Sequence, residues 1–462
     1  MAENKIDTYY FLGIGGIGMS ALARYFASEG CCVLGYDRTC TPLTTELEAE
    51  GIAVQYDDRL DWVEGLDMEK TLVVRTPAVP EDAAVYVWLR EHGFHIVKRA
   101  ELLGEVTRQK KALCVAGTHG KTTTSTILAH ILYGSHAGAN AFLGGIANNY
   151  GTNLLLNKES DVVVVEADEF DRSFHHLTPY MSVITSMDPD HLDIYGTEAA
   201  YRASFEQYAG LVEHALVVKS SLKLNVESLK ARVYTYSVGE KADFYADNVR
   251  VKDGEIWFDF YTPESKVADI QLGVPVLVNV ENSVAAMALA VLMGATEEEL
   301  REGMRSFMGV YRRFNVHVNT PRVTYIDDYA HHPQELKATI DSVRYLYPER
   351  YVIGVFQPHL YSRTKDFADG FAEVLSGLDE VALLPIYPAR EEPIEGVTSE
   401  WLMEKIGTKR ALVLPSILPK YLCERAKSCV AQGKDCVVIT MGAGDIDRHV
   451  KDITKALQNI NL

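Results

Sequence analysis

The stretch Ala112-Leu-Cys-Val-Ala-Gly-Thr-His-Gly-Lys-Thr-Thr-Thr124 predicts a strand, a glycine loop and the start of a helix. The helix is expected from Thr122, because the apolar residues between Ile127 and Leu132 recur at helical spacing. Glycines let the backbone approach an anion, and the amides of the helix N-terminus face it. The stretch therefore predicts a variant phosphate cradle, with Val115 where an ordinary P-loop has its first glycine.

Two side chains give this loop its expected chemistry. Lys121 would neutralise the β- and γ-phosphates of ATP, and the Thr122 hydroxyl would bind Mg²⁺. We expect Lys121→Ala to abolish turnover and leave the fold intact, because a phosphate ligand that faces solvent contributes little to a core. The ATP contacts expected from the loop are Gly117, Thr118, His119, Gly120, Lys121, Thr122 and Thr123.

A triphosphate site also needs an acidic metal ligand at the end of a neighbouring strand. Glu166 directly follows the apolar run Val162–Val165 and is the predicted ligand. His191, within Asp188–Asp193, would bind a second metal or the substrate, or would be a loop histidine without a ligand. Three further acids fit a solvated loop equally well: Asp168, Glu169 and Asp171.

A second glycine-rich stretch, Gly13-Ile-Gly-Gly-Ile-Gly18, follows the apolar run Tyr9–Leu12 and precedes a helix expected from Ser20. Asp37 ends the next strand, about twenty residues on, as in dinucleotide-binding proteins. The pattern specifies only a diphosphate above a helix N-terminus, which a UDP-sugar also supplies. It therefore leaves NAD and a UDP-sugar open.

The 462 residues are too many for one core, and strand-like runs alternate with helical segments from end to end. A charged stretch, Arg108–Lys111, separates a first doubly wound module from the second, which closes near Arg312–Asn319. We predict an α/β protein with domains at 1–108, 109–318 and 319–462. The last would hold a third parallel sheet built from the runs Val323–Ile326, Tyr351–Phe356, Val381–Leu384, Ala411–Leu414 and Val437–Met441.

The net charge, the N-terminal segment and the cysteines disfavour several classes of protein. The formal net charge of −19 disfavours nonspecific nucleic-acid binding, because a polyanion would be repelled. Neither a signal peptide nor a membrane span is evident, and the seven cysteines include no C-x-x-C pair. We expect a cytoplasmic protein that is a monomer or a weak homodimer.

Five ordered motifs together resemble the Mur ligase family. The likeness spans the chain and continues through Arg312-Arg-Phe314, Phe356-Gln-Pro-His359, Arg363 and Glu392-Pro-Ile394. It implies three α/β domains, each a largely parallel sheet with flanking helices: a Rossmann-like UDP-sugar domain, a central P-loop ATPase and a Rossmann-like amino-acid domain. The five motifs are Gly13–Ser20, Gly117–Thr123, Glu166–Asp171, Asp190–Asp193 and Asp327–Pro333.

The resemblance also implies roles for individual residues. His119 and His191 would lie between ATP and the muramyl group, with Asn279, Asn282 and Arg313 toward the adenosine. Residues that would face the UDP portion are Gly15, Gly16, Gly18, Ser20, Asp37 and Thr76. Residues at the alanine end would be Tyr329, His331, His359 and Arg363. The catalytic set implied in this way is Lys121, His191, His331, His359 and Arg363.

Several positions depart from the family pattern, which bears on the adenine and alanine contacts. The departing residues are Val278, Ser186, Ala330 and Leu360, in place of a usual histidine, asparagine, glycine and arginine. Relatives that add later amino acids carry a modifiable lysine where Phe205 stands, which favours the member that adds L-alanine to UDP-N-acetylmuramate with ATP and Mg²⁺. Three alternatives stay open: a tripeptide recycling ligase, an NAD-dependent dehydrogenase and a catalytically silent sugar-nucleotide sensor.

Overall fold

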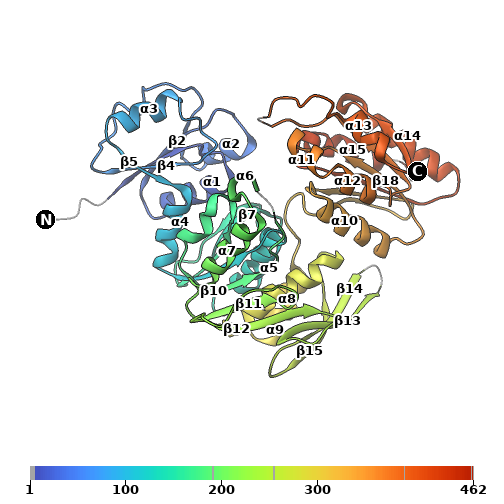
Figure 1. Cartoon of the computed structure of the whole chain (residues 1–462), viewed down its shortest axis with the longest axis horizontal. Coiled ribbons are helices and arrows are strands. Elements are labelled where there is room, and N and C mark those ends of the chain that lie inside the picture. Colours follow the sequence, from blue (N-terminus) through green and yellow to red (C-terminus); the bar gives the residue numbers. More distant parts are fainter. Residues whose placement is uncertain (1–5, 190–191, 253–254, 390, 459, 461–462) are drawn as a thin grey trace. The chain divides into compact units, whose positions relative to one another are not determined.

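The computed structural model describes residues 6–189, 192–252, 255–389, 391–458 and 460, which form three sheets with flanking helices (Figure 1). The chain divides into two compact units. The first comprises residues 1–247, 259–270 and 282–307, and the second comprises 248–258, 271–281 and 308–462. Among the described residues, no helix combines the length and the apolar character that crossing a bilayer requires.

The first sheet has five parallel strands in the order β3-β2-β1-β4-β5. Alternate residues of β1 face opposite sides, so that Phe11 packs with α1 and α4 while Tyr10 packs with α3. The strands are β1 (Thr8–Leu12), β2 (Cys32–Tyr36), β3 (Ala53–Gln55), β4 (Thr71–Arg75) and β5 (His95–Lys98). The helices are α1 (Ile17–Ser28), α2 (Pro42–Ala49), α3 (Ala84–Glu91) and α4 (Arg99–Arg108).

The second sheet has ten strands in the order β15-β14-β13-β12-β11-β10-β6-β9-β7-β8. Its central strands β6, β9 and β10 are parallel, and they are almost continuously apolar because both faces are covered. The strands are β6 (Lys111–Ala116), β7 (Asn140–Ala147), β8 (Thr152–Leu155), β9 (Val162–Ala167), β10 (Pro179–Ile184), β11 (Ala215–Lys219), β12 (Arg232–Val238), β13 (Phe244–Lys252), β14 (Glu255–Tyr261) and β15 (Lys266–Gln271).

Several residues of the predicted ATP site lie on the loops and helices that follow these strands. The glycine loop after β6 leads into α5, and a short 3-10 helix, η1, follows β9. The helical elements are α5 (Lys121–Tyr133), η1 (Phe170–His176), α6 (Leu192–Tyr195), α7 (Glu198–Ala209), α8 (Leu277–Leu292) and α9 (Glu297–Ser306).

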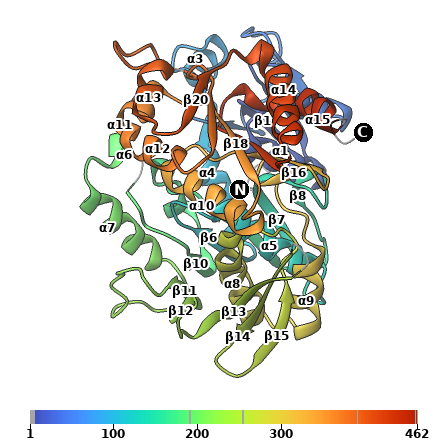
Figure 2. The ribbon, with the colours of Figure 1, turned by 90° about the vertical axis from the view of Figure 1, so that its right-hand side faces the viewer.

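The third sheet has six strands in the order β16-β17-β21-β18-β19-β20, parallel except for the antiparallel pair β16–β17. Two apolar clusters cover its faces, one with α10, α12 and α13 and the other with α14 and α15, on either side of β18 in Figure 2. The strands are β16 (Asn315–Asn319), β17 (Val323–Asp328), β18 (Tyr351–Phe356), β19 (Glu380–Leu383), β20 (Lys409–Leu412) and β21 (Cys436–Met441). The helical elements are α10 (Pro333–Leu346), α11 (Tyr361–Asp366), α12 (Ala368–Leu375), α13 (Ser399–Lys405), η2 (Pro415–Ile417), α14 (Leu418–Ala431), η3 (Asp445–His449) and α15 (Val450–Gln458).

Helices α1, α5 and α8 begin earlier than the sequence predicted, α5 by a single residue, at Lys121. The first starts at Ile17 rather than Ser20, because Gly16 already has the extended backbone of a helix N-cap. Helix α8 starts at Leu277 rather than Asn282, where the Leu277 N–H donates to the Ser342 hydroxyl. This places Asn279 and Asn282 one turn apart on one helix. The domain boundaries after residues 108 and 318 stay predictions.

Candidate active site

The lysine loop connects β6 to α5 and depends on two glycines. Gly117 and Gly120 both have positive φ angles, of 138° and 82°. A β-carbon on Gly117 would lie 2.1 Å from the Thr185 hydroxyl, and one on Gly120 would lie 2.6 Å from Asn282 Oδ1. No other residue type fits either position without displacing a neighbour, so the glycines hold the loop close to β10 and α8.

Hydroxyl groups fix the loop to the end of β10. The Thr118 hydroxyl donates to the Asp188 carbonyl at 2.7 Å and lies 2.7 Å from the Tyr201 hydroxyl. The His119 N–H donates to the Ser186 hydroxyl at 2.7 Å. Ser186, which departs from the family pattern, thus serves as an acceptor that holds the loop backbone.

Lys121 begins α5 and is paired with a carboxylate. Its ammonium donates to the Gly117 carbonyl at 2.7 Å and to Glu169 Oε2 at 2.6 Å. Only 12% of the Lys121 side chain and 2% of the Glu169 side chain is exposed. Burial lowers the pKa of Lys121, but the carboxylates of Glu169, Asp168 and Glu166 raise it by more, so the ammonium stays charged.

The two residues predicted to bind Mg²⁺, Thr122 and Glu166, both offer oxygen atoms. Glu166 stands near the end of β9, in register with Val115 of β6, and a β-carbon on Gly144 would lie 1.9 Å from Glu166 Oε2. The strand β7 thus leaves room for the carboxylate where a side chain would block it. Within the described part of the chain, no three His, Cys, Asp or Glu side chains gather as a metal cluster. Thr122 and Glu166 would therefore supply two hard oxygen ligands, and phosphate and water the others.

Asp37, which lies after β2, accepts a hydrogen bond from the first glycine loop. The Gly15 N–H donates to Asp37 Oδ2 at 2.9 Å, and the Thr39 N–H donates to Asp37 Oδ1 at 3.0 Å. A β-carbon on Gly13 would lie 2.5 Å from the Thr76 side chain. Each oxygen of Asp37 therefore accepts one hydrogen bond from the backbone and can accept a second.

A cavity of about 290 Å³ extends from this loop to the Glu166 carboxylate. Gly16, Gly18 and Thr76 line one part of it, and Gly144 and Glu166 line another. Arg99, at the start of α4, also lines it and lies 3.8 Å from Asp168. The cavity therefore brings the first glycine loop, the Arg99 guanidinium and the Glu166 carboxylate together within one compact unit.

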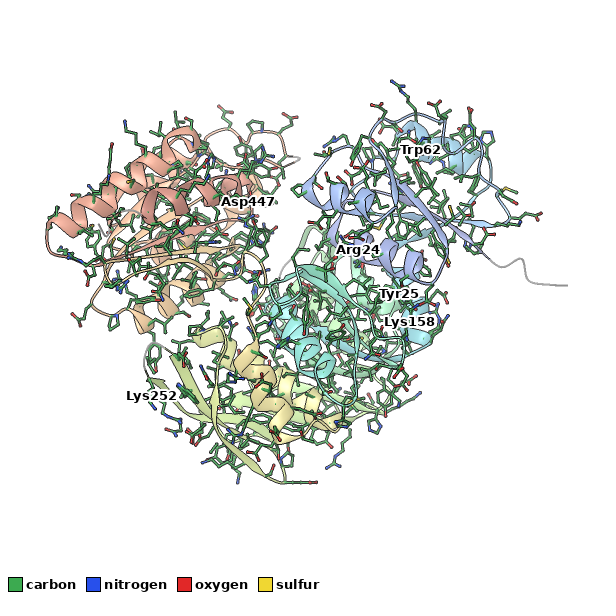
Figure 3. The ribbon with its side chains drawn as sticks, turned by 180° about the vertical axis from the view of Figure 1, so that it is seen from behind. Arg24, Tyr25, Trp62, Lys158, Lys252 and Asp447 are labelled. Carbon is green, nitrogen blue, oxygen red and sulfur yellow. The ribbon has the colours of Figure 1, made fainter. Side chains whose placement is uncertain are left out.

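Ser20 has a different environment. It is fully buried on α1, where its hydroxyl donates to the Ile17 carbonyl and accepts from the Asn153 amide at 3.1 Å. Asn153, on β8, also donates to the Ile17 carbonyl and accepts from Arg24. Arg24 and Tyr25, both on α1, are labelled in Figure 3. These bonds join α1 to the edge of the second sheet.

The second compact unit brings together the residues predicted for the alanine end. His331 and His359 have ring centroids 6.2 Å apart, and Tyr329 lies 5.3 Å from His331. The Arg363 guanidinium donates to His359 Nδ1 at 3.3 Å. Arg313 lies over the Tyr329 ring, 5.1 Å from its centroid, and Asn279 belongs to the same unit.

The two histidines are neutral and have opposite tautomers. Burial lowers the pKa of His331, and burial together with His331 and Arg363 lowers the pKa of His359 to about 4. His331 Nδ1 lies 3.1 Å from the Tyr329 carbonyl, which only accepts, so Nδ1 carries the proton and Nε2 is basic. In His359, Nδ1 accepts from Arg363, so Nε2 carries the proton. His331 can therefore take up a proton and His359 can donate a hydrogen bond.

Comparison with known proteins accounts for nearly the whole chain. Residues 8–111 match the Mur ligase family, catalytic domain; residues 115–290 match the Mur ligase middle domain; and residues 312–444 match the Mur ligase, glutamate ligase domain. The chain belongs to the Mur ligase family. The family resemblance and the three-part α/β fold expected from the sequence are confirmed.

Among its relatives in the Mur ligase family are proteins named UDP-N-acetylmuramate–L-alanine ligase. The one from Parabacteroides distasonis is 53% identical, over 99% of this chain and 98% of its own. The one from Flavobacterium psychrophilum is 47% identical, over 99% of both chains. The crystal structure of UDP-N-acetylmuramate-alanine ligase from Thermotoga maritima superimposes with a TM-score of 0.80 at 27% identity, over 98% of this chain and 99% of that one.

Sequence reasoning missed several residues of this Mur ligase. The sequence fits a solvated loop at Glu169 equally well, yet the side chain is buried against Lys121. Arg99, Gly144 and Asn153 carried no recognisable sequence signal, because their partners are distant in sequence. His191, predicted as a metal ligand, lies outside the described residues. The roles predicted for the remaining site residues stay predictions.

Proposed function

We propose that this chain is an ATP-dependent ligase that joins L-alanine to the lactyl carboxylate of UDP-N-acetylmuramate in peptidoglycan precursor synthesis. Its full-length likeness to ligases of that name supports the assignment. The geometric observation that carries it is the cavity from the first glycine loop to Glu166, which lies on the strand next to the lysine loop. A sugar nucleotide in that cavity would have its acid directed toward the ATP site. Because the reaction consumes ATP, we place it in the cytoplasm.

In the first step the lactyl carboxylate oxygen attacks the γ-phosphorus of ATP. A bond forms between the two, the bond from the γ-phosphorus to the bridging oxygen breaks, and ADP leaves with an acyl phosphate remaining. Lys121 and the loop amides stabilise the charge that spreads over the transferred group. Mg²⁺, held by Thr122 and Glu166, would supply further neutralisation of the phosphate oxygens.

In the second step the amine of L-alanine attacks the acyl carbon. The tetrahedral intermediate collapses to the amide as the carbon–oxygen bond to phosphate breaks, and the amine loses its proton. His331 Nε2 is the acceptor that the tautomers favour, since His359 presents an N–H. Arg363, held by His359, would bind the alanine carboxylate in a bidentate contact.

The same fold serves a second acceptor in relatives. The murein peptide ligase from Psychrobacter arcticus superimposes with a TM-score of 0.69 at 21% identity, which establishes a shared fold. A tripeptide recycling ligase of the same family is the second candidate, because membership of the family leaves the acceptor open. An NAD-dependent dehydrogenase would use only the first glycine loop and would leave the lysine loop without a role.

Phosphate release from purified protein tests the proposal. We expect inorganic phosphate only when ATP, UDP-N-acetylmuramate and L-alanine are all present. Release with tripeptide but not alanine would assign the recycling reaction. Binding of UDP-N-acetylmuramate without turnover would indicate a sugar-nucleotide sensor, and an absorbance change with NAD would indicate a dehydrogenase. Sedimentation of the same preparation would test the prediction of a monomer or weak homodimer.

A further inference from the structure

Glu169 forms an ion pair with Lys121, the cation that the lysine loop would offer to a phosphate group. Its Oε2 lies 2.6 Å from the Lys121 ammonium, and only 2% of its side chain is exposed to solvent. A lysine ammonium has three N–H donors. One donates to the Gly117 carbonyl, another to Glu169 and the third to the Thr118 carbonyl at 3.5 Å, so a phosphate oxygen meets a lysine that is already paired with a carboxylate.

The fold, rather than Lys121 alone, places this carboxylate. The Glu169 carbonyl accepts from the Tyr195 hydroxyl at 2.5 Å and from the Arg172 N–H at 3.0 Å. Asp171 and Arg172 both have left-handed backbones, with φ of 51° and 54°, which kink the chain within η1. Asp171 is further tied to Lys98 by a 2.7 Å ion pair. The segment therefore holds Glu169 firmly beside the loop.

We propose that Glu169 is a positioning residue that acts through Lys121 and weakens nucleotide binding, so that ADP leaves after each turnover. The role rests on the proposed function, because it requires that the loop bind nucleotide. A buried anion beside the phosphate-binding cation opposes a polyphosphate, since like charges repel strongly where water is excluded. The same carboxylate directs the ammonium toward the loop by accepting its hydrogen bond.

Removing the charge while keeping the shape should therefore tighten nucleotide binding. Glu169→Gln keeps an oxygen acceptor for Lys121 but removes the repulsion. We expect the dissociation constant for MgADP to fall about tenfold. That change lies toward the low end of the coupling energies known for close charge pairs. Glu169→Ala should act in the same direction, and Glu169→Asp, which keeps the charge, should bind as the unaltered protein does. The KM for L-alanine should not change.

Titration calorimetry of the full chain with MgADP decides between this role and a purely structural one. Glu206→Gln is the matched control, because it makes the same change at an exposed position of α7, outside the segment that holds Glu169. We expect the control to bind as the unaltered protein does. Weaker or equal binding by both Glu169→Gln and Glu169→Ala would overturn the role of Glu169, and either variant decides alone if the other does not fold. Absence of binding by the unaltered protein would instead overturn the nucleotide assignment, and this role with it.

Discussion

At the scale of the residue, Lys121 has two roles. It is the predicted phosphate ligand, and it is also the counter-ion of a buried carboxylate. The expectation that Lys121→Ala leaves the fold intact assumed a lysine facing solvent, and that assumption is wrong. Its replacement would leave Glu169 buried beside no cation.

We predict that Lys121→Ala abolishes phosphate release and also destabilises the protein by roughly 3 kcal/mol, the cost of a buried charge that has lost its partner. Adding Glu169→Gln removes that charge. The double variant should regain most of the lost thermal stability and none of the activity. Calorimetric unfolding with a phosphate assay measures both, and equal stability of the single and double variants would contradict the prediction.

His331 is predicted to act as the base for the alanine amine. His331→Gln should lower kcat roughly 100-fold, within the usual range for general base catalysis. His359→Gln instead removes the partner of Arg363 and should mainly raise the KM for alanine. The split between kcat and KM in the two variants tests the assignment, and reversed effects would exchange the two roles.

Gly144 is predicted to keep space for the metal carboxylate. Gly144→Ala places a β-carbon 1.9 Å from the position of Glu166 Oε2, so the carboxylate must move. We expect the Mg²⁺ concentration for half-maximal activity to rise severalfold. Gly65→Ala is a suitable control, because nothing lies within 4 Å of its β-carbon position. An unchanged magnesium dependence in Gly144→Ala would show that Glu166 is not a ligand.

At the scale of the element, helix α1 follows the first glycine loop and packs against strands β7 and β8 of the second sheet. Tyr25 on α1 packs edge-on against Phe142 of β7, with ring centroids 5.4 Å apart. The Asn153 side chain on β8 makes three hydrogen bonds to α1. The loop expected to bind the UDP-sugar is thus aligned by a strand of the ATP-binding sheet.

Asn153→Ala should loosen that alignment. It removes the side-chain hydrogen bonds that join β8 to the Ile17 carbonyl, the Ser20 hydroxyl and Arg24, at a cost of about 1 to 3 kcal/mol in unfolding free energy. We expect the KM for UDP-N-acetylmuramate to rise while the KM for ATP stays constant. Kinetic constants for both substrates, with thermal unfolding alongside, measure this. Equal changes in both KM values would indicate a general loss of structure instead.

At the scale of the whole molecule, acid should destabilise the fold through its buried histidines. Burial holds the pKa of His359 near 4, against an ordinary value of 6.5. Between these values the unfolded chain binds a proton that the folded chain does not, so stability falls as the pH is lowered from 6.5 to 4. Thermal unfolding between pH 7 and pH 4.5 should show this slope. His359→Phe should have a shallower slope, and an identical slope would contradict the prediction.

The sequence predicted the parts of the fold that apolar runs mark. The strand Tyr351–Phe356 is confirmed residue for residue, and the lysine loop lies between a strand and a helix as expected. Strands β13 to β15 were missed, since β13 carries several exposed polar residues and lacks a continuous apolar run. The burial of Glu169 could not be predicted, because its partner lies 48 residues earlier in the chain.

The two glycines of the lysine loop also bear on how this protein could be inhibited. Gly117 and Gly120 cannot accept a side chain without a collision against Thr185 or Asn282. A compound that gains its affinity from the backbone amides between them would therefore meet a surface that point mutation cannot readily alter. Drug resistance would have to arise elsewhere in the molecule.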